Sequence, residues 1–216
     1  MKNRYLFLIS LIFLSLNIFA QSTFEENGIV YMEDPGHPDK MQVYVMQKKS
    51  PLLYPGQSAY TGDIIIPAQI EHDLDTYDVV ALGHLAFMNC NITSLDIQAP
   101  ITSIDHNMIY STTLKKLRLP DTLKILRGLE APNLEEVYFG EGLQDLNDSP
   151  SLFYFTGNQK RDFHCPWKNL PTPPRIHIVY DSANPTINFY VPKGMRNEYI
   201  SQWNLAEING VNVIEE

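Results

Sequence analysis

The amino-acid sequence predicts an α/β solenoid that is mostly β, in which short repeat coils stack their strands in parallel. An apolar pattern of the form L-x-x-L-x-L recurs after 22 and then 20 residues, in the segments 92–97, 114–119 and 134–139. Apolar pairs recur in phase with it, at 79/82, 101/104, 123/126 and 143/146. A third apolar position follows the same period, at Phe87, Ile109 and Ala131. Such recurrence indicates stacked coils that bury a ladder of side chains and leave function to their outer surface.

Residues 1–20 have the layout of a secretory signal peptide. Lys2 and Arg4 precede an apolar run from Tyr5 to Leu16, and a short segment then ends at Ala20. The run is shorter than the roughly 20 residues that span a bilayer. We therefore expect cleavage after Ala20 rather than a retained anchor, and a protein that is secreted, periplasmic or on the cell surface.

The charge of the remaining chain argues against nucleic acid as a partner. The leader holds two of the 16 basic residues and none of the 25 acidic ones, so the mature chain has 14 basic groups and a formal charge of −11. Binding a phosphate backbone requires clustered Lys and Arg. No later segment predicts a membrane span, and residues 21–216 are enough for a single domain with a core of its own.

The first part of the domain, residues 21–76, predicts a β-rich N-terminal cap. Strand-like runs at 28–31, 42–46 and 62–67 are separated by turn residues such as those at 34–38 and 55–56. A repeat array needs such a cap, because its first coil otherwise exposes the apolar ladder to water.

Residues 77–155 predict the repeat coils themselves, about three and a half of them. The residues between the ladder positions point outward, because side chains alternate along a strand. Five residues separate Phe87 from Ile92 and Ile109 from Leu114, but only three separate Ala131 from Leu134. The third coil therefore has a tighter turn in this segment.

Residues 156–216 predict a C-terminal capping region. Strand-like runs cover 175–180 and 187–192, and a helix is expected over 194–203. Its residues Met195, Tyr199 and Trp203 share one face at a spacing of four. That stripe is either a ligand platform or the buried side of the cap, and we expect the buried side.

Four ordered features together resemble the BspA-like leucine-rich-repeat family, the type-5 repeats of bacterial surface proteins. They are the coil pattern of 79–97, the strand 62–67 before the repeats, the opening 27–31 and the closing segment 189–194 with Tyr199 and Trp203. The later coils depart from the pattern, since Phe87-x-x-Cys90 becomes Ile109-x-x-Thr112. The resemblance covers nearly the whole mature chain and implies a short leucine-rich-repeat array. It also implies an exported or surface protein of anaerobic bacteria, a family in which some members are adhesins.

Catalytic and metal-binding motifs do not stand out in the sequence. There is no G-x-S-x-G, the six histidines have no partner spacing, and adjacent acids such as Glu135–Glu136 face opposite ways on a strand. We therefore expect no enzyme activity, no cofactor and no metal ion. Cys90 and Cys165 are the only cysteines; a disulfide is one reading, and a small apolar core residue is the expected one for Cys90. Thr122 and Ser182 fit a short O-glycosylation pattern.

The candidate binding surface is the outer face of the repeat strands. It is made of Asp96, Lys116, Arg118, Glu136 and Tyr138, which strand alternation places side by side on neighbouring coils. The other interpretation, and the one we favour from these residues alone, is that cross-strand pairs Asp96–Arg118–Glu136 only satisfy an exposed sheet.

Three functions follow from these observations. The leading hypothesis is a non-enzymatic exported protein that binds an unknown protein or glycan through this sheet and acts in adhesion. The alternatives are a glycan-processing hydrolase or accessory protein, and a structural envelope component without a specific ligand.

Overall fold

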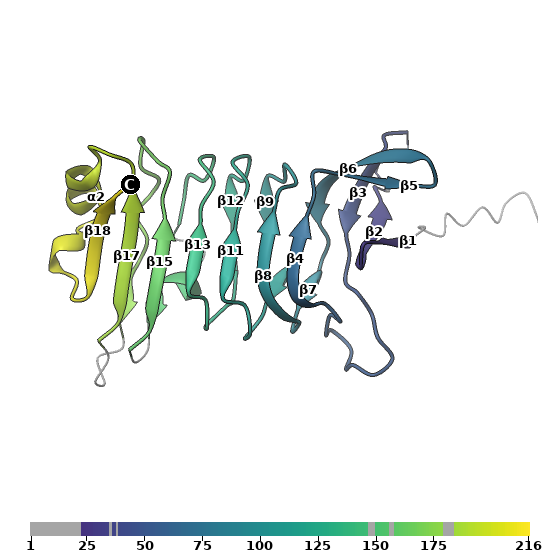
Figure 1. Cartoon of the computed structure of the whole chain (residues 1–216), viewed down its shortest axis with the longest axis horizontal. Coiled ribbons are helices and arrows are strands. Elements are labelled where there is room, and N and C mark those ends of the chain that lie inside the picture. The colour runs from purple at the N-terminus through teal and green to yellow at the C-terminus, as the bar shows by residue number, and fades with distance from the viewer. Residues whose placement is uncertain (1–22, 35, 38, 147–149, 156–157, 179–183) are drawn as a thin grey trace, which may run out of the picture.

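The protein is mostly β, with stacked parallel strands, as the sequence predicts. Its structure is a computed structural model that describes residues 23–34, 36–37, 39–146, 150–155, 158–178 and 184–216. The predicted signal peptide and Ser182 lie outside the described residues. Figure 1 shows the strands standing side by side along the long axis of the molecule, in the order of the chain from β4 onward.

A seven-stranded sheet runs through most of the molecule, and all its neighbouring strands are parallel. In spatial order its strands are β18 (Val211–Glu215), β17 (Thr186–Val191), β15 (Lys160–His164), β13 (Glu136–Tyr138), β11 (Lys116–Arg118), β8 (Asn91–Ile97) and β4 (Thr61–Ile66). Parallel neighbours require a long return connection between consecutive strands. The intervening segments supply it and carry short strands of their own.

Those short strands form three parallel pairs. They are β7 (Phe87–Met88) with β10 (Ile109–Tyr110), β9 (Ser103–Ile104) with β12 (Ile125–Leu126), and β14 (Tyr154–Phe155) with β16 (His177–Ile178). Phe87 lies opposite Ile109, and Ile104 lies opposite Leu126. Equivalent residues of the in-phase apolar pairs, and equivalent residues of the third apolar position, are therefore neighbours in space.

A separate five-stranded sheet stands at the N-terminal end. Its order is β1 (Thr23–Glu26), β2 (Ile29–Glu33), β3 (Gln42–Val45), β6 (Asp75–Leu82) and β5 (Gln69–His72). The first apolar pair of the in-phase set, Val79 and Leu82, belongs to this sheet, where it pairs with Val43 and Val45 of β3. By contrast, β4 lies in the large sheet and pairs with β8.

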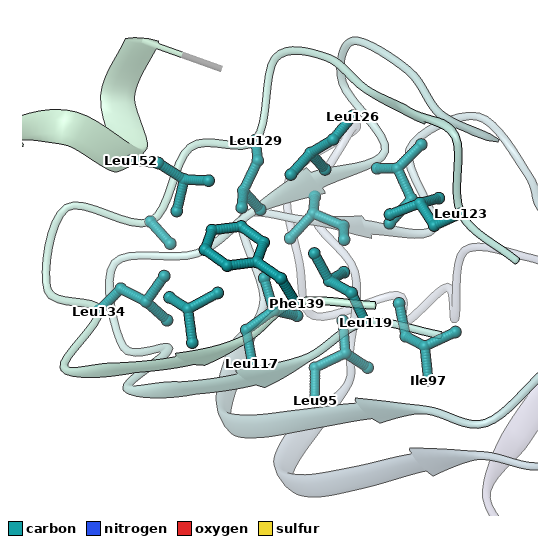
Figure 2. Close-up of a cluster of buried hydrophobic side chains, with 14 of the residues drawn as sticks. Leu95, Ile97, Leu117, Leu119, Leu123, Leu126, Leu129, Leu134, Phe139 and Leu152 are labelled. Atoms are coloured by element: carbon teal, nitrogen blue, oxygen red, sulfur yellow. The ribbon is translucent and has the colours of Figure 1, made fainter. Parts of the chain in front are cut away.

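The interior lies between the large sheet and the return segments. Leu95, Leu117 and Val137 are direct neighbours across β8, β11 and β13, which confirms the predicted ladder. All three are at most 1% exposed. Figure 2 shows Leu95, Leu117 and Phe139 pointing from this sheet toward Leu123, Leu126 and Leu129 of the return segments. Burial of such apolar area is the main stabilising contribution to a fold of this kind.

The large sheet continues through the segment for which the sequence predicts a cap. Beyond residue 155 it gains β15, β17 and β18, and its interior becomes aromatic, with Phe163 and Phe189 stacked at a ring-centroid distance of 5.2 Å. The helix α2 (Arg196–Gln202) and the 3-10 turn η2 (Leu205–Glu207) close this end, and η1 (Pro150–Phe153) precedes β14. Tyr199 and Trp203 are buried, so the stripe of α2 faces the core and is not a ligand platform.

Cys90 and Cys165 are both free and buried. Burial raises the pKa of both thiols, so each is held in its neutral form. Both therefore act as small core residues in this structure.

Candidate functional site

The five predicted surface residues lie together on the outer face of β8, β11 and β13. The strand register forms two rows, with Lys116 opposite Glu136, and Arg118 between Asp96 and Tyr138. We call these five residues, Asp96, Lys116, Arg118, Glu136 and Tyr138, the polar strip. Their side chains point outward because the buried Leu95, Leu117 and Val137 occupy the alternate positions.

Ion pairs and ring contacts connect the two rows. Lys116 Nζ lies 2.7 Å from Glu136 Oε2, and the Tyr138 hydroxyl donates to Glu136 Oε1 at 2.6 Å. The Arg118 guanidinium lies 4.2 Å from the centre of the Tyr138 ring, a cation–π contact. Of the expected cross-strand pairs, Asp96 does lie opposite Arg118, but the strand register puts Lys116, not Arg118, opposite Glu136.

Arg118 retains most of its hydrogen-bonding capacity. Its nearest carboxylate atom is Asp96 Oδ1, 3.9 Å from Arg118 Nε, which is too long for a hydrogen bond. The Arg118 side chain is 52% exposed. Asp96 Oδ1 has no hydrogen-bond partner among the described residues. The flat guanidinium is thus held in place by the ring beneath it while its N–H groups stay available to a ligand.

The ionisation of the polar strip reflects these contacts. Burial raises the pKa of Glu136, but the hydrogen bonds from Lys116 and Tyr138 offset it, so its pKa is lowered overall. The hydrogen bond to Glu136 raises the pKa of Lys116 and also that of Tyr138. At neutral pH the strip therefore holds one carboxylate–ammonium pair and one neutral phenol.

The same outer row continues beyond the predicted residues, through His164 and Tyr190. The Tyr138 and His164 rings are 4.1 Å apart with an interplanar angle of 4°, and the His164 and Tyr190 rings are 4.7 Å apart at 9°. We call these three residues the aromatic ladder. Its ring faces cover one another, and Arg118 covers the outer face of Tyr138. Tyr138 and His164 therefore have no free ring face for stacking on a ligand, and they present ring edges and polar atoms to solvent.

Two carboxylates flank the central ring of the ladder. His164 Nε2 lies 3.4 Å from Glu136 Oε1, and His164 Nδ1 lies 3.2 Å from Glu216 Oε1. These contacts connect Glu136 of β13 and Glu216 to His164 of β15, and they orient the imidazole ring parallel to its two neighbouring rings.

Sequence reasoning missed His164 and Tyr190 because their strands do not show the leucine pattern. On β15 the inward residue before Phe163 is a charged one, the fully buried Arg161. The available signal was the alternation Phe163-His164-Cys165 and Phe189-Tyr190-Val191, in which one polar ring separates two buried side chains.

A groove of about 930 Å³ lies beside the polar strip, near the starts of the same strands. We call it the notch. All of its lining residues except Leu134 have polar or charged side chains, although apolar atoms make up more of the lining surface than polar atoms do: Thr93, Thr112, Thr113, Lys115, Asn133, Leu134, Glu135, Glu136, Gln159, Lys160 and Asp162. The volume lies in the upper part of the range for small-molecule sites.

The shortened third coil forms the middle of the notch. Leu134 N donates to Ala131 O at 3.1 Å, so the segment is a single tight turn, as the residue count predicts. Buried Arg161 holds this turn from inside: its Nε donates to Leu134 O at 2.8 Å and its Nη2 to Pro132 O at 3.1 Å. Arg161 also donates to Leu152 O and packs over the Phe155 ring. Desolvation lowers the pKa of Arg161 to about 10, so the guanidinium remains charged at neutral pH.

The other predicted sites have simpler settings. Within the described segments, no three His, Cys, Asp or Glu side chains are close enough together to hold a metal ion. Thr122 is exposed, and its hydroxyl donates to Ile101 O at 2.9 Å. Across the part of the chain that the structure describes, no helix is both long and apolar enough to cross a membrane.

Comparison with protein-family models, with curated proteins and with solved structures finds no match to this chain.

Proposed function

We propose that this chain is a short leucine-rich-repeat solenoid that acts as an exported, non-enzymatic binding protein and recognises a protein or a glycan through the outer face of its large sheet. The observation that carries this proposal is the continuous outer row Asp96–Arg118–Tyr138–His164–Tyr190. It places charged and aromatic side chains on five adjacent strands, all pointing away from the core.

The solenoid part of the proposal is supported by period and register together. Residues 22 and 20 apart in the sequence are neighbours in the large sheet, as for Leu95, Leu117 and Val137. The return segments repeat the same relation, for Phe87 with Ile109. Equivalent residues of successive repeats thus lie side by side both in the large sheet and in the return segments, which is the arrangement expected of a repeat array.

The composition of the outer row supports binding. Arg and Tyr are the residue types that most often dominate the energetics of protein interfaces, and stacked, preorganised side chains lose little entropy on binding. The rings of Tyr138 and His164 are contacted on both faces and Tyr190 on the face toward His164, and Arg118 packs on Tyr138. The protein itself therefore orders these side chains.

A triple substitution of Asp96→Ala, Arg118→Ala and Tyr138→Ala tests the proposed face. The partner is first captured with the wild-type protein and identified, and its affinity is then measured for both proteins. We expect at least a tenfold loss of affinity, and unchanged affinity would remove this face as the binding site. A matched control changes an acid, a base and a tyrosine away from this sheet, Glu130, Lys124 and Tyr154, to alanine and retains binding.

A further inference from the structure

The notch exists because one coil is shorter than its neighbours. Its lining residues come from four successive coils, and Asn133, Leu134 and Glu135 of the short turn lie between the longer turns that carry Thr112 and Thr113 on one side and Gln159 and Lys160 on the other. Buried Arg161 fixes the carbonyls of Pro132 and Leu134 behind it. The hollow is therefore a fixed feature of the backbone and does not depend on a flexible side chain.

The lining of the notch is rich in hydrogen-bond acceptors. Asn133 Nδ2 donates to Thr112 O at 2.7 Å, which leaves Asn133 Oδ1 without a donor among the described residues. The Thr113 hydroxyl donates its hydrogen to Ile92 O at 2.8 Å and keeps lone pairs to accept with. The carboxylates of Glu135, Glu136 and Asp162 add further lone pairs, although Asp162 Oδ1 already accepts from Asn188 Nδ2 at 2.7 Å and Glu136 already accepts from Lys116 and Tyr138. A ligand with many O–H donors satisfies such a surface.

The charges of the notch disfavour an anionic ligand. Each of its two lysines already has a carboxylate partner, with Lys115 Nζ 2.6 Å from Glu135 Oε1 and Lys160 Nζ 2.9 Å from Asp162 Oδ2. Both lysine side chains are more than half exposed. Such exposed pairs contribute little stability and rearrange at low cost, so they can donate to a hydroxyl oxygen while the carboxylates accept.

The length and the apolar part of the notch fit a chain of sugar rings. The lining crosses β8, β11, β13 and β15, and three strand spacings amount to about 14 Å. Thr93, Thr112 and Thr113 line the notch, and the methyl group of a threonine is a suitable apolar contact for ring C–H groups. A single sugar leaves much of this length empty.

We propose that the notch binds a neutral oligosaccharide, with Asn133, Glu135 and Asp162 accepting from its hydroxyl groups. This inference rests on the proposed binding role of the sheet face and names the class of ligand. The hydroxyl-rich chain is either free or attached to a glycoprotein, because both present the same chemistry to the notch.

Calorimetric titration of the mature chain tests the proposal directly. The probes are linear tetrasaccharides of glucose, mannose, xylose and N-acetylglucosamine, with a tetrasaccharide of galacturonic acid as the anionic comparison. We expect at least one neutral probe to bind and the anionic one to bind at least tenfold more weakly. A glycoprotein carrying the sugar that binds, titrated before and after enzymatic removal of its glycans, distinguishes the attached from the free source.

Two variants locate the binding in the notch. Insertion of Gly-Ser between Pro132 and Asn133 restores the length of the other coils and fills the hollow, and Thr112→Arg blocks it with one side chain. We expect each to weaken binding at least tenfold. The matched controls are the same insertion between Asp73 and Leu74, at an exposed hairpin tip, and Thr76→Arg in the N-terminal sheet, both of which retain binding.

The outcomes separate this inference from the proposed function. Circular dichroism and the thermal midpoint establish that each variant is folded. If the insertion variant does not fold, the binding measured for Thr112→Arg alone decides. If no neutral probe binds the folded wild-type protein, or if one binds equally to Thr112→Arg, the notch proposal is overturned. A protein partner lost only in the Asp96/Arg118/Tyr138 variant would then leave the proposed function standing by itself.

Discussion

The two halves of the large sheet have the same backbone arrangement but different interiors. Between β8 and β13 the inward positions are aliphatic, as in Leu95, Leu117 and Val137. From β15 onward the corresponding positions of the ladder are aromatic, Phe163 and Phe189, beside the aliphatic Ile187 and Val191, and β15 also holds a buried arginine. Parallel pairing thus fixes the direction and register of the strands. The buried side chains can differ in type, provided that they fill the interior volume and that their polar atoms are hydrogen-bonded.

The outer face changes in step with the interior. The first half carries paired charges, Lys116 with Glu136 and Arg118 near Asp96, whereas the second half carries the rings of His164 and Tyr190. Tyr138 lies at the boundary and contacts both, through Arg118 on one side and His164 on the other. The difference shows that the chemistry of the outer face can change along the large sheet while the backbone arrangement stays the same.

Removing the buried arginine should have the largest effect on this comparison. Arg161→Ala leaves the carbonyls of Leu134 and Leu152 without this donor and empties the space over Phe155, while Pro132 O keeps its hydrogen bond from Gln159 Nε2. Two unsatisfied buried acceptors cost about 1–3 kcal/mol each and the lost packing adds to this, so we expect a loss of at least about 3 kcal/mol in the free energy of unfolding. Urea titration measures it, and a loss below about 1 kcal/mol would show that the second half does not depend on Arg161.

Matched truncations compare the two interiors directly. Phe163→Ala removes ring contacts to Phe153 and Phe189 and should cost about 3–5 kcal/mol, while Leu117→Ala should cost about 2–5 kcal/mol. Denaturant unfolding followed by circular dichroism gives both values. Ile65→Ala, on a side chain that is 55% exposed, is the control and should stay within about 0.5 kcal/mol. A Phe163→Ala cost no larger than the control would contradict a shared, continuous core.

Breaking the boundary between the halves should have an intermediate effect. Tyr138→Ala removes the cation–π contact with Arg118 and the stack on His164, which we expect to cost about 1–2 kcal/mol. Thermal unfolding measures the change. Tyr154→Ala serves as its control, since that tyrosine is 51% exposed on β14, and it should change stability by less than about 0.5 kcal/mol. Equal effects of the two substitutions would mean that the stacking in the aromatic ladder adds no stability.

The charged pair of the first half should have the smallest effect and the clearest pH dependence. The pKa of Glu136 is lowered below its ordinary 4.5, so its contribution is present above that value and is lost as pH falls through the folded-state pKa. The pKa of Lys116 is raised above 10.5, so its contribution is lost as pH rises through the raised value. A double-mutant cycle with Glu136→Gln and Lys116→Met should give a coupling of about 0.2–1 kcal/mol at pH 7. The coupling should vanish at both extremes of pH, and a coupling that stays constant from acid to alkaline pH would contradict the pair.

The sequence by itself determined the regular part of this protein. Side chains alternate along every strand and the apolar pattern returns every 20–22 residues, so the ladder of Leu95, Leu117 and Val137 and the outward direction of Asp96, Arg118 and Tyr138 were predictable. The short turn at Ala131–Leu134 was also predictable, because it required only a count of residues.

Only the tertiary structure decided where the sheet continues and what it displays there. A buried arginine is acceptable at Arg161 because carbonyls from Pro132, Leu134 and Leu152 converge on it, and those residues lie 9 to 29 positions away in the sequence. No local sequence pattern predicts that these carbonyls meet at Arg161. The sequence of β15 therefore looks like that of a polar segment, and the places of His164 and Tyr190 in the outer row cannot be predicted from it. The notch likewise requires the short turn and its longer neighbours to be placed side by side. Pairing between distant segments determines these features, and a single sequence records local preference but not such pairing.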